Sequence, residues 1–345
     1  MTIHDEIFEQ VDALARLFQG QMGAVAQIAR QIEQIEPAYI FLTARGTSDN
    51  AGRYANYLWG SLNRLVVAQA TPSLFTIYRN PPRLKGALVV GISQSGQSPD
   101  IVGVLEEGQR QGCPTLAITN ERDSPLARAA DFVIDILAGE EKAVAATKTY
   151  TSELMAIAML CAALSGDESQ LETLKLVPGW VAEVLESDEQ IARIAERYRY
   201  MSRCVVIGRG YNYATAFEWS LKLKELTYVV AEPYSPADFL HGPIAMIERG
   251  FPVLAVAHSG RIFDDVLALL ERLRHDLAAE LVVVSDRDEA LELAQSPLRL
   301  PEGIPEWLSP LVAIVPAQLF AYYLTRAKGF DTEHPRVIQK VTETR

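Results

Sequence analysis

Three serine hydroxyls in one short segment are the first feature of this sequence that could do chemistry. The segment GISQSGQSPD places Ser93, Ser95 and Ser98 around Gly96, between an apolar run and Pro99. Proline suits the first turn of a helix and serine suits the N-cap position before it. Hydroxyls beside the free N–H groups of a helix start can hold a phosphate without much positive charge. A plain capped turn has the same pattern, so this loop alone leaves both interpretations open.

A second pair of hydroxyls follows a neighbouring strand-like run. Thr47 and Ser48 come directly after Gly46 and the run 39–43. The carboxyl ends of parallel strands meet at one edge of a sheet, so both loops should open on the same crevice. Together they favour a phosphorylated ligand.

Acid–base groups are concentrated in the segment EWSLKLKELTYVVAEPYSPADFLHGP. It carries Lys222 and Glu225 and, sixteen residues later, His241 before Gly-Pro. Alone, Glu225 on an amphipathic helix would be a surface partner of a nearby lysine, and His241 would be part of a turn. The five histidines form no H-x-x-H or H-E-x-x-H pair, so we predict no metal site.

The elements that must position these groups alternate between strands and helices. Short β-branched runs at 39–43, 86–93, 114–120, 131–136 and 204–208 are separated by helical or turn-rich sequence. Helical patterns also cover 5–36 and about 150–200, the latter with a break expected at Pro178-Gly179. This order predicts an α/β fold with a doubly wound, mainly parallel sheet.

The pattern occurs twice. Arg45-Gly46 recurs as Arg209-Gly210, and Ser95-Gly96 recurs as Ser259-Gly260, in both cases 164 residues later. We infer a duplicated α/β domain. The hydroxyls are concentrated in the first copy, whereas the arginine occurs in both, which favours a fold-positioning role for Arg45 and Arg209.

Composition excludes several classes of protein. The 345 residues are 49% hydrophobic and carry 32 Lys plus Arg against 44 Asp plus Glu, a net charge of −12 without a basic run, so nucleic acid is not an expected partner. Cys113, Cys161 and Cys204 are far apart and should be reduced core thiols. The N-terminus shows no secretory signal, which predicts a cytoplasmic protein. The uncharged stretch 307–325 contains two prolines and is expected to be a buried helix rather than a membrane span.

Six motifs in order resemble a known family. RGTS at 45–48, SQSGQS at 93–98, EEKAVAATKTYT at 140–151, LKLKE at 221–225, HGP at 241–243 and KVTE at 340–343 resemble tandem sugar isomerase (SIS) domains, as in the isomerase half of glucosamine-6-phosphate synthases. The opening RGTSDNA and the ending KVTET are most similar to stand-alone SIS-type glucosamine-6-phosphate deaminases. The expected organisation is a helical segment at 1–21, SIS domains at 22–166 and 200–332, a helical connector at 167–199 and a C-terminal tail at 333–345.

The resemblance implies a role for each matching residue. Glu225 is the proton-transfer base with Lys222 as its helper, His241 opens the sugar ring, and Lys340 lies in a tail that covers the site. The phosphate would be held by Ser93, Gln94, Ser95 and Ser98, and the sugar would contact Thr47, Ser48, Val144, Ala145, Ala146 and Thr147. The family also implies a homodimer, with His241 reaching across the interface, and no cofactor.

The expected reaction is conversion of glucosamine 6-phosphate to fructose 6-phosphate and ammonia. An aldose–ketose isomerase and a fructosamine-phosphate deglycase are the enzymatic alternatives, and a sugar-phosphate sensor without turnover is the alternative of another class. Ala146 stands where the synthases have a serine, and Asp238-Phe239-Leu240 replaces their acidic-Leu-Lys, so the substrate preference stays open. Thr2 stands where the synthases' amidotransferase half has its catalytic cysteine, so we expect no use of glutamine.

Overall fold

The chain folds into two compact units, each built on its own sheet. The computed structural model describes residues 2–340. The N-terminal unit comprises 9–142, 146–178 and 339–340, and the C-terminal unit comprises 2–8, 143–145 and 179–338. These two names are used below.

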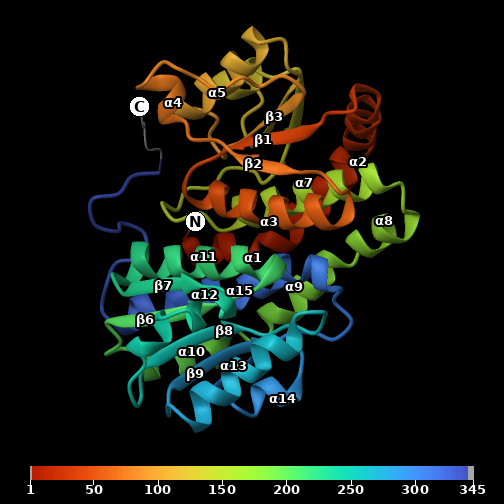
Figure 1. The fold of residues 1–345 in the computed structure, drawn as a ribbon. Coiled ribbons are helices and arrows are strands. Elements are labelled where there is room, and N and C mark those ends of the chain that lie inside the picture. The colour runs from red at the N-terminus through yellow and green to blue at the C-terminus, as the bar shows by residue number, and fades with distance from the viewer. Residues whose placement is uncertain (1, 341–345) are drawn as a thin grey trace. The chain divides into compact units, whose positions relative to one another are not determined.

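The N-terminal unit is a five-stranded parallel sheet with the strand order β2-β1-β3-β4-β5. Its strands are β1 (Tyr39–Thr43), β2 (Val67–Gln69), β3 (Ala87–Ile92), β4 (Thr115–Thr119) and β5 (Phe132–Asp135). Its helices are α2 (Gln10–Ile35), α3 (Gly46–Leu62), α4 (Ser73–Thr76), α5 (Pro99–Arg110), α6 (Pro125–Arg128), α7 (Lys148–Ser165) and α8 (Glu168–Leu174). Figure 1 shows α4 and α5 on one side of the sheet and α3 and α7 on the other.

The C-terminal unit repeats this arrangement with the order β10-β9-β8-β6-β7, again all parallel. Its strands are β6 (Arg203–Ile207), β7 (Val230–Tyr234), β8 (Pro252–Val256), β9 (Glu280–Ser285) and β10 (Ser296–Arg299). Its α-helices are α1 (Ile3–Phe8), α10 (Asp188–Arg197), α11 (Tyr213–Lys222), α12 (Pro236–Leu240), α13 (Phe263–His275), α14 (Asp288–Leu291) and α15 (Ser309–Ala327), and α9 (Val177–Leu185) precedes α10. Short 3₁₀ turns lie at η1 (Gly210–Asn212), η3 (Pro243–Met246) and η4 (Glu306–Leu308), and η2 (Leu223–Thr227) is a π-helical turn.

The sequence prediction of a duplicated, doubly wound α/β fold is confirmed. In each sheet the second strand along the chain lies at one edge, and the next three strands extend the sheet in the opposite direction. The chain therefore reverses direction between β1 and β3, and again between β6 and β8. Loops on either side of such a reversal diverge and leave a crevice at the carboxyl ends of the strands. In the N-terminal unit these are the two hydroxyl-bearing loops.

Hydrophobic burial on both faces stabilises each sheet. In the N-terminal unit the strands β3 and β4 pack against α5 through a cluster that includes Val89, Val104 and Leu105. In the C-terminal unit β8 and β9 pack against α13 through Val253, Leu270 and other residues. Strands covered on both faces are near-continuously apolar, which explains why runs such as ALVVGI were recognisable from sequence.

The long uncharged stretch is a core helix, as predicted. It forms α15, and 94% of the apolar window within Glu306–Ala327 is buried. α15 contacts α10 and α11, which share its unit. Pro316 lies inside this helix. The buried environment accounts for the apolar composition without a membrane.

The three cysteines are free and buried. Burial raises the pKa of Cys161 and of Cys204 to about 12, so both thiols stay protonated at neutral pH. The prediction of reduced core thiols is confirmed.

Some sequence predictions were wrong in detail. The break expected at Pro178-Gly179 lies earlier, after α8, and Pro178 stands in the first turn of α9. Proline is tolerated there because the N–H that it lacks has no partner within a helix start. The helical stretch 5–36 is two helices, α1 and α2. The edge strands β2 and β7 were not anticipated, because VAQ is short and partly polar and VAEPY contains a proline.

Candidate functional site

The predicted phosphate loop connects β3 to α5 in the N-terminal unit. Ser93 Oγ accepts a hydrogen bond from Gly96 N at 3.1 Å, and Ser95 Oγ accepts one from Gln97 N at 3.4 Å. Gly96 has a φ of +60°, and a methyl group on it would collide with Ser124. Only glycine fits this position. The two serines use lone pairs to shape the turn, so their O–H groups can be donated to an anion.

Ser98 is the N-cap of α5, as predicted, but its hydroxyl has a partner inside the protein. Ser98 Oγ donates to Asp100 Oδ1 at 2.8 Å, and the other Asp100 oxygen accepts from Arg45 Nε at 2.8 Å. Asp100 is 1% exposed, so this ion pair joins the two hydroxyl-bearing loops through a buried carboxylate. A phosphate at Ser98 would have to draw its proton away from Asp100.

The C-terminal unit has an ion pair of the same residue types. Arg209 Nη1 lies 3.3 Å from Asp265 Oδ2 in the first turn of α13, but the Asp265 side chain is 60% exposed and the 164-residue offset pairs Asp100 with Asp264 instead. The fold-positioning role of Arg45 and Arg209 therefore stays a prediction.

Thr47 and Ser48, the two hydroxyl residues in the first turn of α3, differ in burial. Thr47 is half-buried, whereas Ser48 is buried and donates to Glu153 Oε1 on α7 at 2.8 Å. Ser48 therefore packs between two helices in this structure, and Thr47 is the more accessible of the two for a ligand.

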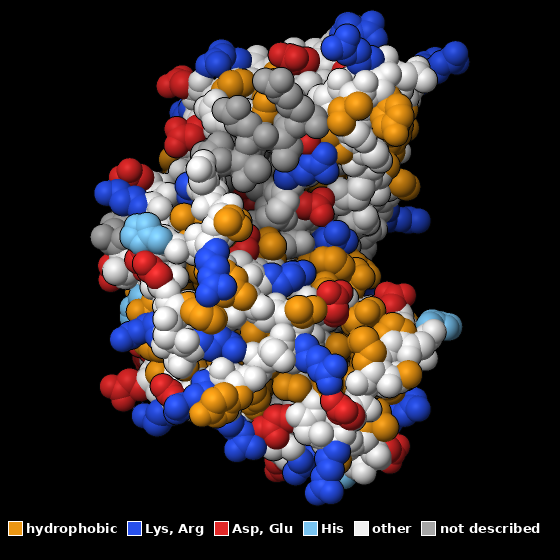
Figure 2. Space-filling model, turned by 90° about the vertical axis from the view of Figure 1, so that its left-hand side faces the viewer, with side chains coloured by type: hydrophobic (Ala, Val, Ile, Leu, Met, Phe, Trp, Pro, Cys, Tyr) orange, Lys and Arg blue, Asp and Glu red, His pale blue; other side chains and the backbone are white. Residues whose placement is uncertain are grey.

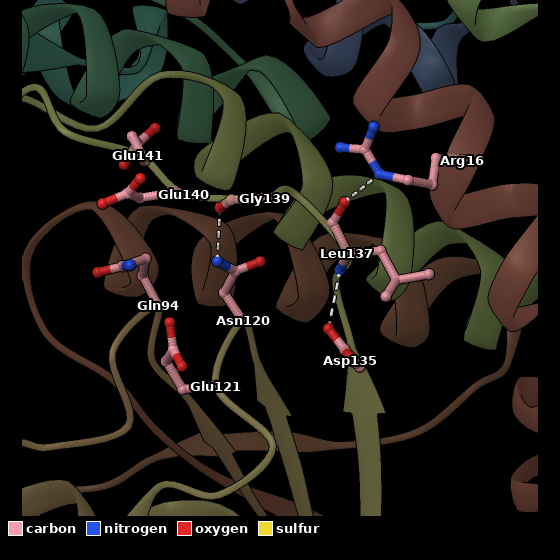
Figure 3. Close-up of a pocket in the computed structure, with 9 residues that line it drawn as sticks. All are labelled: Arg16, Gln94, Asn120, Glu121, Asp135, Leu137, Gly139, Glu140 and Glu141. Carbon is pink, nitrogen blue, oxygen red and sulfur yellow. Dashed lines mark hydrogen bonds between the residues drawn. The ribbon is translucent and has the colours of Figure 1, made fainter.

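A cavity of about 400 Å³ joins the phosphate loop to the segment before α7 (Figure 3). Gln94 lines it together with Glu141, and Arg16 of α2 lies on the opposite side. Arg16 Nε donates to Leu137 O at 2.8 Å, and Asn120 Nδ2 donates to Gly139 O at 2.8 Å. These contacts fix the course of the chain between β5 and α7. Of the predicted substrate contacts, Gln94 lines this cavity, whereas residues 144–147 do not.

Glu141 organises the loop that carries the predicted sugar contacts, and sequence analysis gave it no role. Its side chain is buried, and it accepts hydrogen bonds from Thr147 N at 2.9 Å and from Thr149 Oγ1 at 2.8 Å. Lys340, the predicted tail residue, donates to it at 2.5 Å. A carboxylate three positions before Val144 was visible in the motif, but nothing in the sequence pairs it with a residue 199 positions away.

The acid–base cluster of the C-terminal unit lies where α11 gives way to the π-helical turn η2. Lys222 Nζ lies 2.6 Å from Glu225 Oε2 and 3.3 Å from Glu218 Oε1. Lys222 and Glu218 are buried, whereas the Glu225 side chain is 25% exposed. π-helical turns inserted in helices occur often at functional sites. Here the turn presents one carboxylate to the outside while its lysine partner stays in the core.

Electrostatics hold this cluster in its charged form. Burial alone would lower the pKa of Lys222, but Glu218 and Glu225 outweigh it and raise the pKa above the ordinary lysine value. The ammonium is therefore permanent at neutral pH. Of the two carboxyl groups around this ammonium, Glu225 is the one that a ligand can reach.

His241 lies at the C-terminal end of α12 and is exposed. The helix is capped by Ser235, whose Oγ accepts from Asp238 N at 3.1 Å. Gly242 follows with a φ of +146°, so the chain turns sharply after the histidine. Within residues 2–340, His241 makes no hydrogen bond or ion pair with Glu225 or Lys222.

The predicted site residues are divided between the units. The N-terminal unit contains Thr47, Ser48, Ser93, Gln94, Ser95, Ser98, Ala146, Thr147 and Lys340. The C-terminal unit contains Val144, Ala145, Lys222, Glu225 and His241. Within each unit one cluster stands out: the phosphate loop with its cavity in the first, and the Lys222 cluster in the second.

Comparison with known proteins assigns the family. The sequence model of the SIS domain matches residues 35–163 and again 199–327. The chain belongs to the SIS domain family. A glutamine–fructose-6-phosphate aminotransferase (isomerizing) of Thermus thermophilus is 33% identical over 97% of this chain. The chain spans 57% of the length of that relative.

Solved structures agree with this assignment. A putative phosphosugar isomerase from Silicibacter pomeroyi has a TM-score of 0.86 and 31% identity, covering 96% of this chain and 100% of the other. The C-terminal domain of glucosamine-fructose-6-phosphate aminotransferase from Francisella tularensis has a TM-score of 0.88 and 28% identity, covering 96% and 98%.

The second SIS domain lacks the hydroxyl-rich loop, and its own side chains occupy the matching place. Ser259, which corresponds to Ser95, donates its backbone N–H to Asp286 Oδ1 at 2.8 Å and its hydroxyl to Asp286 Oδ2. His258 beside it is buried, and its Nδ1 lies 2.7 Å from Ser259 O. An internal carboxylate thus takes the donors that a ligand would need.

Residues 2–340 hold no group of three or more His, Cys, Asp or Glu side chains that could bind a metal ion. The surface carries mixed charges: Figure 2 shows acidic and basic side chains interspersed over the face drawn.

Proposed function

We propose that this chain converts glucosamine 6-phosphate and water to fructose 6-phosphate and ammonia. The observation that carries the proposal is the Lys222–Glu225 pair at 2.6 Å, in which the accessible carboxylate belongs to the motif that the family uses for proton transfer. The family membership and the phosphosugar names of the relatives support the substrate class. Binding alone would not need a base, so the pair favours an enzyme over a sensor.

The proposed chemistry uses this chain's own residues. His241 moves a proton between the ring oxygen and the C1 hydroxyl to open the sugar ring. The Glu225 carboxylate then removes the C2 proton, which gives an enolamine, and returns the proton to C1, which gives a ketimine at C2. Water adds to C2 and the C–N bond breaks, so nitrogen leaves as ammonia and the oxygen of water becomes the ketone oxygen.

The phosphate loop supplies binding in this proposal. The O–H groups of Ser93 and Ser95 and the start of α5 would hold the phosphate, and Gln94 would face the sugar. Thr47 and the segment 144–147 would contact the hydroxyls, and Lys340 would add its ammonium. We keep the homodimer as part of the proposal, which sedimentation of the purified chain tests.

A second candidate is an aldose–ketose isomerase acting on a sugar phosphate. The match with the Silicibacter structure, which is named as a putative phosphosugar isomerase, extends over 100% of that chain. This full-length similarity favours the alternative. The same base and ring-opening group serve both reactions, because an isomerase differs only in the substituent on C2. Ala146 stands where the synthases have a serine, so one hydroxyl that could contact the substrate is missing. The choice between a deaminase and an isomerase therefore needs a direct assay.

The test is a panel of hexosamine, fructosamine and aldose phosphates assayed for both ammonia and ketose. We expect glucosamine 6-phosphate to give the two products in equal amounts, with solvent deuterium at C1 in heavy water. Glu225→Gln should abolish turnover and keep binding, because the amide keeps the shape but cannot accept the proton. Ketose without ammonia would establish the isomerase, and binding of every phosphate without turnover would establish a sensor.

A further inference from the structure

Glu141 lies in a loop, yet its carboxylate is buried and accepts four hydrogen bonds within residues 2–340. Its carboxylate is buried at the start of α7, where Oε1 accepts from Thr147 N at 2.9 Å and from Thr149 N at 3.1 Å. Oε2 accepts from Thr149 Oγ1 at 2.8 Å and from Lys340 Nζ at 2.5 Å. One oxygen thus caps the helix, and the other binds the lysine.

The charge balance makes this contact strong. Burial by itself would raise the pKa of Glu141, but the Lys340 ammonium and the hydrogen bonds from Thr147 and Thr149 outweigh it and lower the pKa. The positive end of an 18-residue helix adds to the same effect. A buried carboxylate of this kind costs free energy unless a cation neutralises it, and among the described residues Lys340 is its one cationic partner.

The lysine depends on the carboxylate in return. Gln339 and Lys340 follow α15 in a stretch without helix or strand, and Gln339 is exposed. Among residues 2–340, Glu141 provides the one hydrogen bond or ion pair of Lys340. The Lys340 side chain is 23% exposed, so its ammonium is held at the protein surface by a buried anchor.

We propose that Glu141 is a positioning residue: its carboxylate binds Lys340 and the backbone of Thr147 together, and so places the Lys340 ammonium at the proposed substrate site. The role of that ammonium in turnover rests on the proposed function, whereas the docking contact does not. Glu141 is therefore a part of the site that acts through another residue and through the loop it caps.

Glu141→Gln separates the two oxygens of this side chain. The amide oxygen can still accept from Thr147 N and Thr149 N, and the amide NH₂ can donate to the Thr149 hydroxyl. The same NH₂ would face the Lys340 ammonium, donor against donor, so the docking contact is lost while the helix cap remains. Glu172→Gln is the matched control, because Glu172 pairs with Lys175 at the same 2.5 Å in an exposed position of the same unit.

The first measurement needs no substrate. Trypsin cleaves after a lysine only when the side chain enters the protease, so docked Lys340 should be protected, and cleavage after Arg336 serves as the internal standard. Glu141→Gln should raise the initial rate of cleavage after Lys340 relative to Arg336 by about tenfold, as expected for one lost charge-assisted hydrogen bond. Glu172→Gln should not change this ratio. An unchanged ratio in Glu141→Gln would overturn the docking role.

The second measurement is a double-variant cycle in turnover. Glu141→Gln and Lys340→Met should lower kcat/KM by similar factors, and the double variant should be no worse than Lys340→Met alone. Losses that multiply would mean that Glu141 affects turnover independently of Lys340, which would overturn the positioning role. If no sugar phosphate turns over, the proposed function fails while the trypsin ratio still decides the contact.

A reciprocal variant covers the case in which Glu141→Gln does not fold. Lys340→Met leaves the start of α7 untouched and removes only the cation. It should raise the pKa of the Glu141 carboxyl, because the Lys340 charge is the largest effect that lowers this pKa against burial. Carbon-13 NMR of the Glu141 carboxyl measures the shift. An unchanged Glu141 pKa in this variant would also overturn the proposal.

Discussion

Glu306 Oε2 accepts a hydrogen bond from the backbone N–H of Arg261 at 3.0 Å, inside the loop that corresponds to the phosphate loop of the first domain. Gly260, which corresponds to Gly96, has a φ of +151°, and a methyl group on it would collide with the Glu306 carboxylate. Together with Asp286 on Ser259, this means that two internal carboxylates occupy the second loop. We therefore expect the predicted phosphate loop of the first domain to be the one of these two matching loops that binds phosphate.

Glu306→Ala should leave the number of binding sites at one. Asp286 still takes both donors of Ser259, so removing Glu306 does not vacate the loop. The variant should lose roughly 0.5–1.5 kcal/mol of unfolding free energy with the hydrogen bond to Arg261. Calorimetric titration with glucosamine 6-phosphate gives the stoichiometry and urea unfolding gives the stability; two molecules bound per chain would contradict this view of the second loop.

Ser95→Ala should weaken the binding of phosphorylated ligands selectively. One charge-assisted hydrogen bond contributes roughly 1.5–3 kcal/mol, so affinity for glucosamine 6-phosphate should fall by about 10- to 150-fold, with little change for glucosamine. Ser259→Ala is the matched control, because Ser259 is the same residue in the second domain and already donates to Asp286. Equal losses for the sugar and its phosphate in a binding titration would place the phosphate elsewhere.

Lys222→Met should destabilise the C-terminal unit, because it removes the buried ammonium that pairs with both Glu218 and Glu225. Breaking a buried ion pair from one side costs about 3–5 kcal/mol. The raised pKa of Lys222 means that its stabilising effect is fully present below the ordinary lysine pKa and is lost only as pH rises through the higher folded value. Denaturant unfolding at pH 8 should show the full deficit of the variant. A variant as stable as the wild type at pH 8 would contradict the cluster.

His258 should make stability fall as the solution becomes acidic. Burial lowers its pKa, and Asp286 opposes the shift only in part. The unfolded chain then binds more protons than the folded one near pH 6, so the free energy of unfolding decreases as pH falls through the ordinary histidine pKa and levels off below the folded value. His258→Gln should flatten this decrease between pH 7 and pH 5 in paired thermal unfolding curves. The opposite slope would mean that the folded protein prefers the imidazolium.

Much of the fold was predictable because its determinants are local. The β-branched runs at β1, β3 and β4 and the glycine turns after them are visible in the sequence, and the shared 164-residue offset revealed the second domain. Of the edge strands, β5 was visible as the run 131–136, whereas β2 and β7 were missed because VAQ is short and partly polar and VAEPY contains a proline.

The sequence indicated which residue types lie at the candidate site, but not which side chains they hydrogen-bond to. The sequence marked Ser48 and Ser98 as hydroxyls near a ligand, yet the structure gives their protons to Glu153 and Asp100. The separations are 105 residues in the first case and two in the second, and neither pairing follows from periodicity. Glu141 was missed for the same reason, since its partner Lys340 lies near the other end of the chain.

Glu225 lies in the π-helical turn η2. The direction in which its carboxylate points therefore depends on how many residues this turn contains, as well as on which residues they are. A turn of this kind contains one residue more than an α-helix would need. Losing one residue between 223 and 227 would close the turn into regular helix and rotate the flanking parts of the chain by about 100° against each other. The carboxylate and the lysine before it would then no longer share one face in the same way, even with every functional side chain kept. Single-residue deletions in this turn should therefore be far less tolerated than substitutions. The number of residues between 223 and 227 is thus constrained as well as their types.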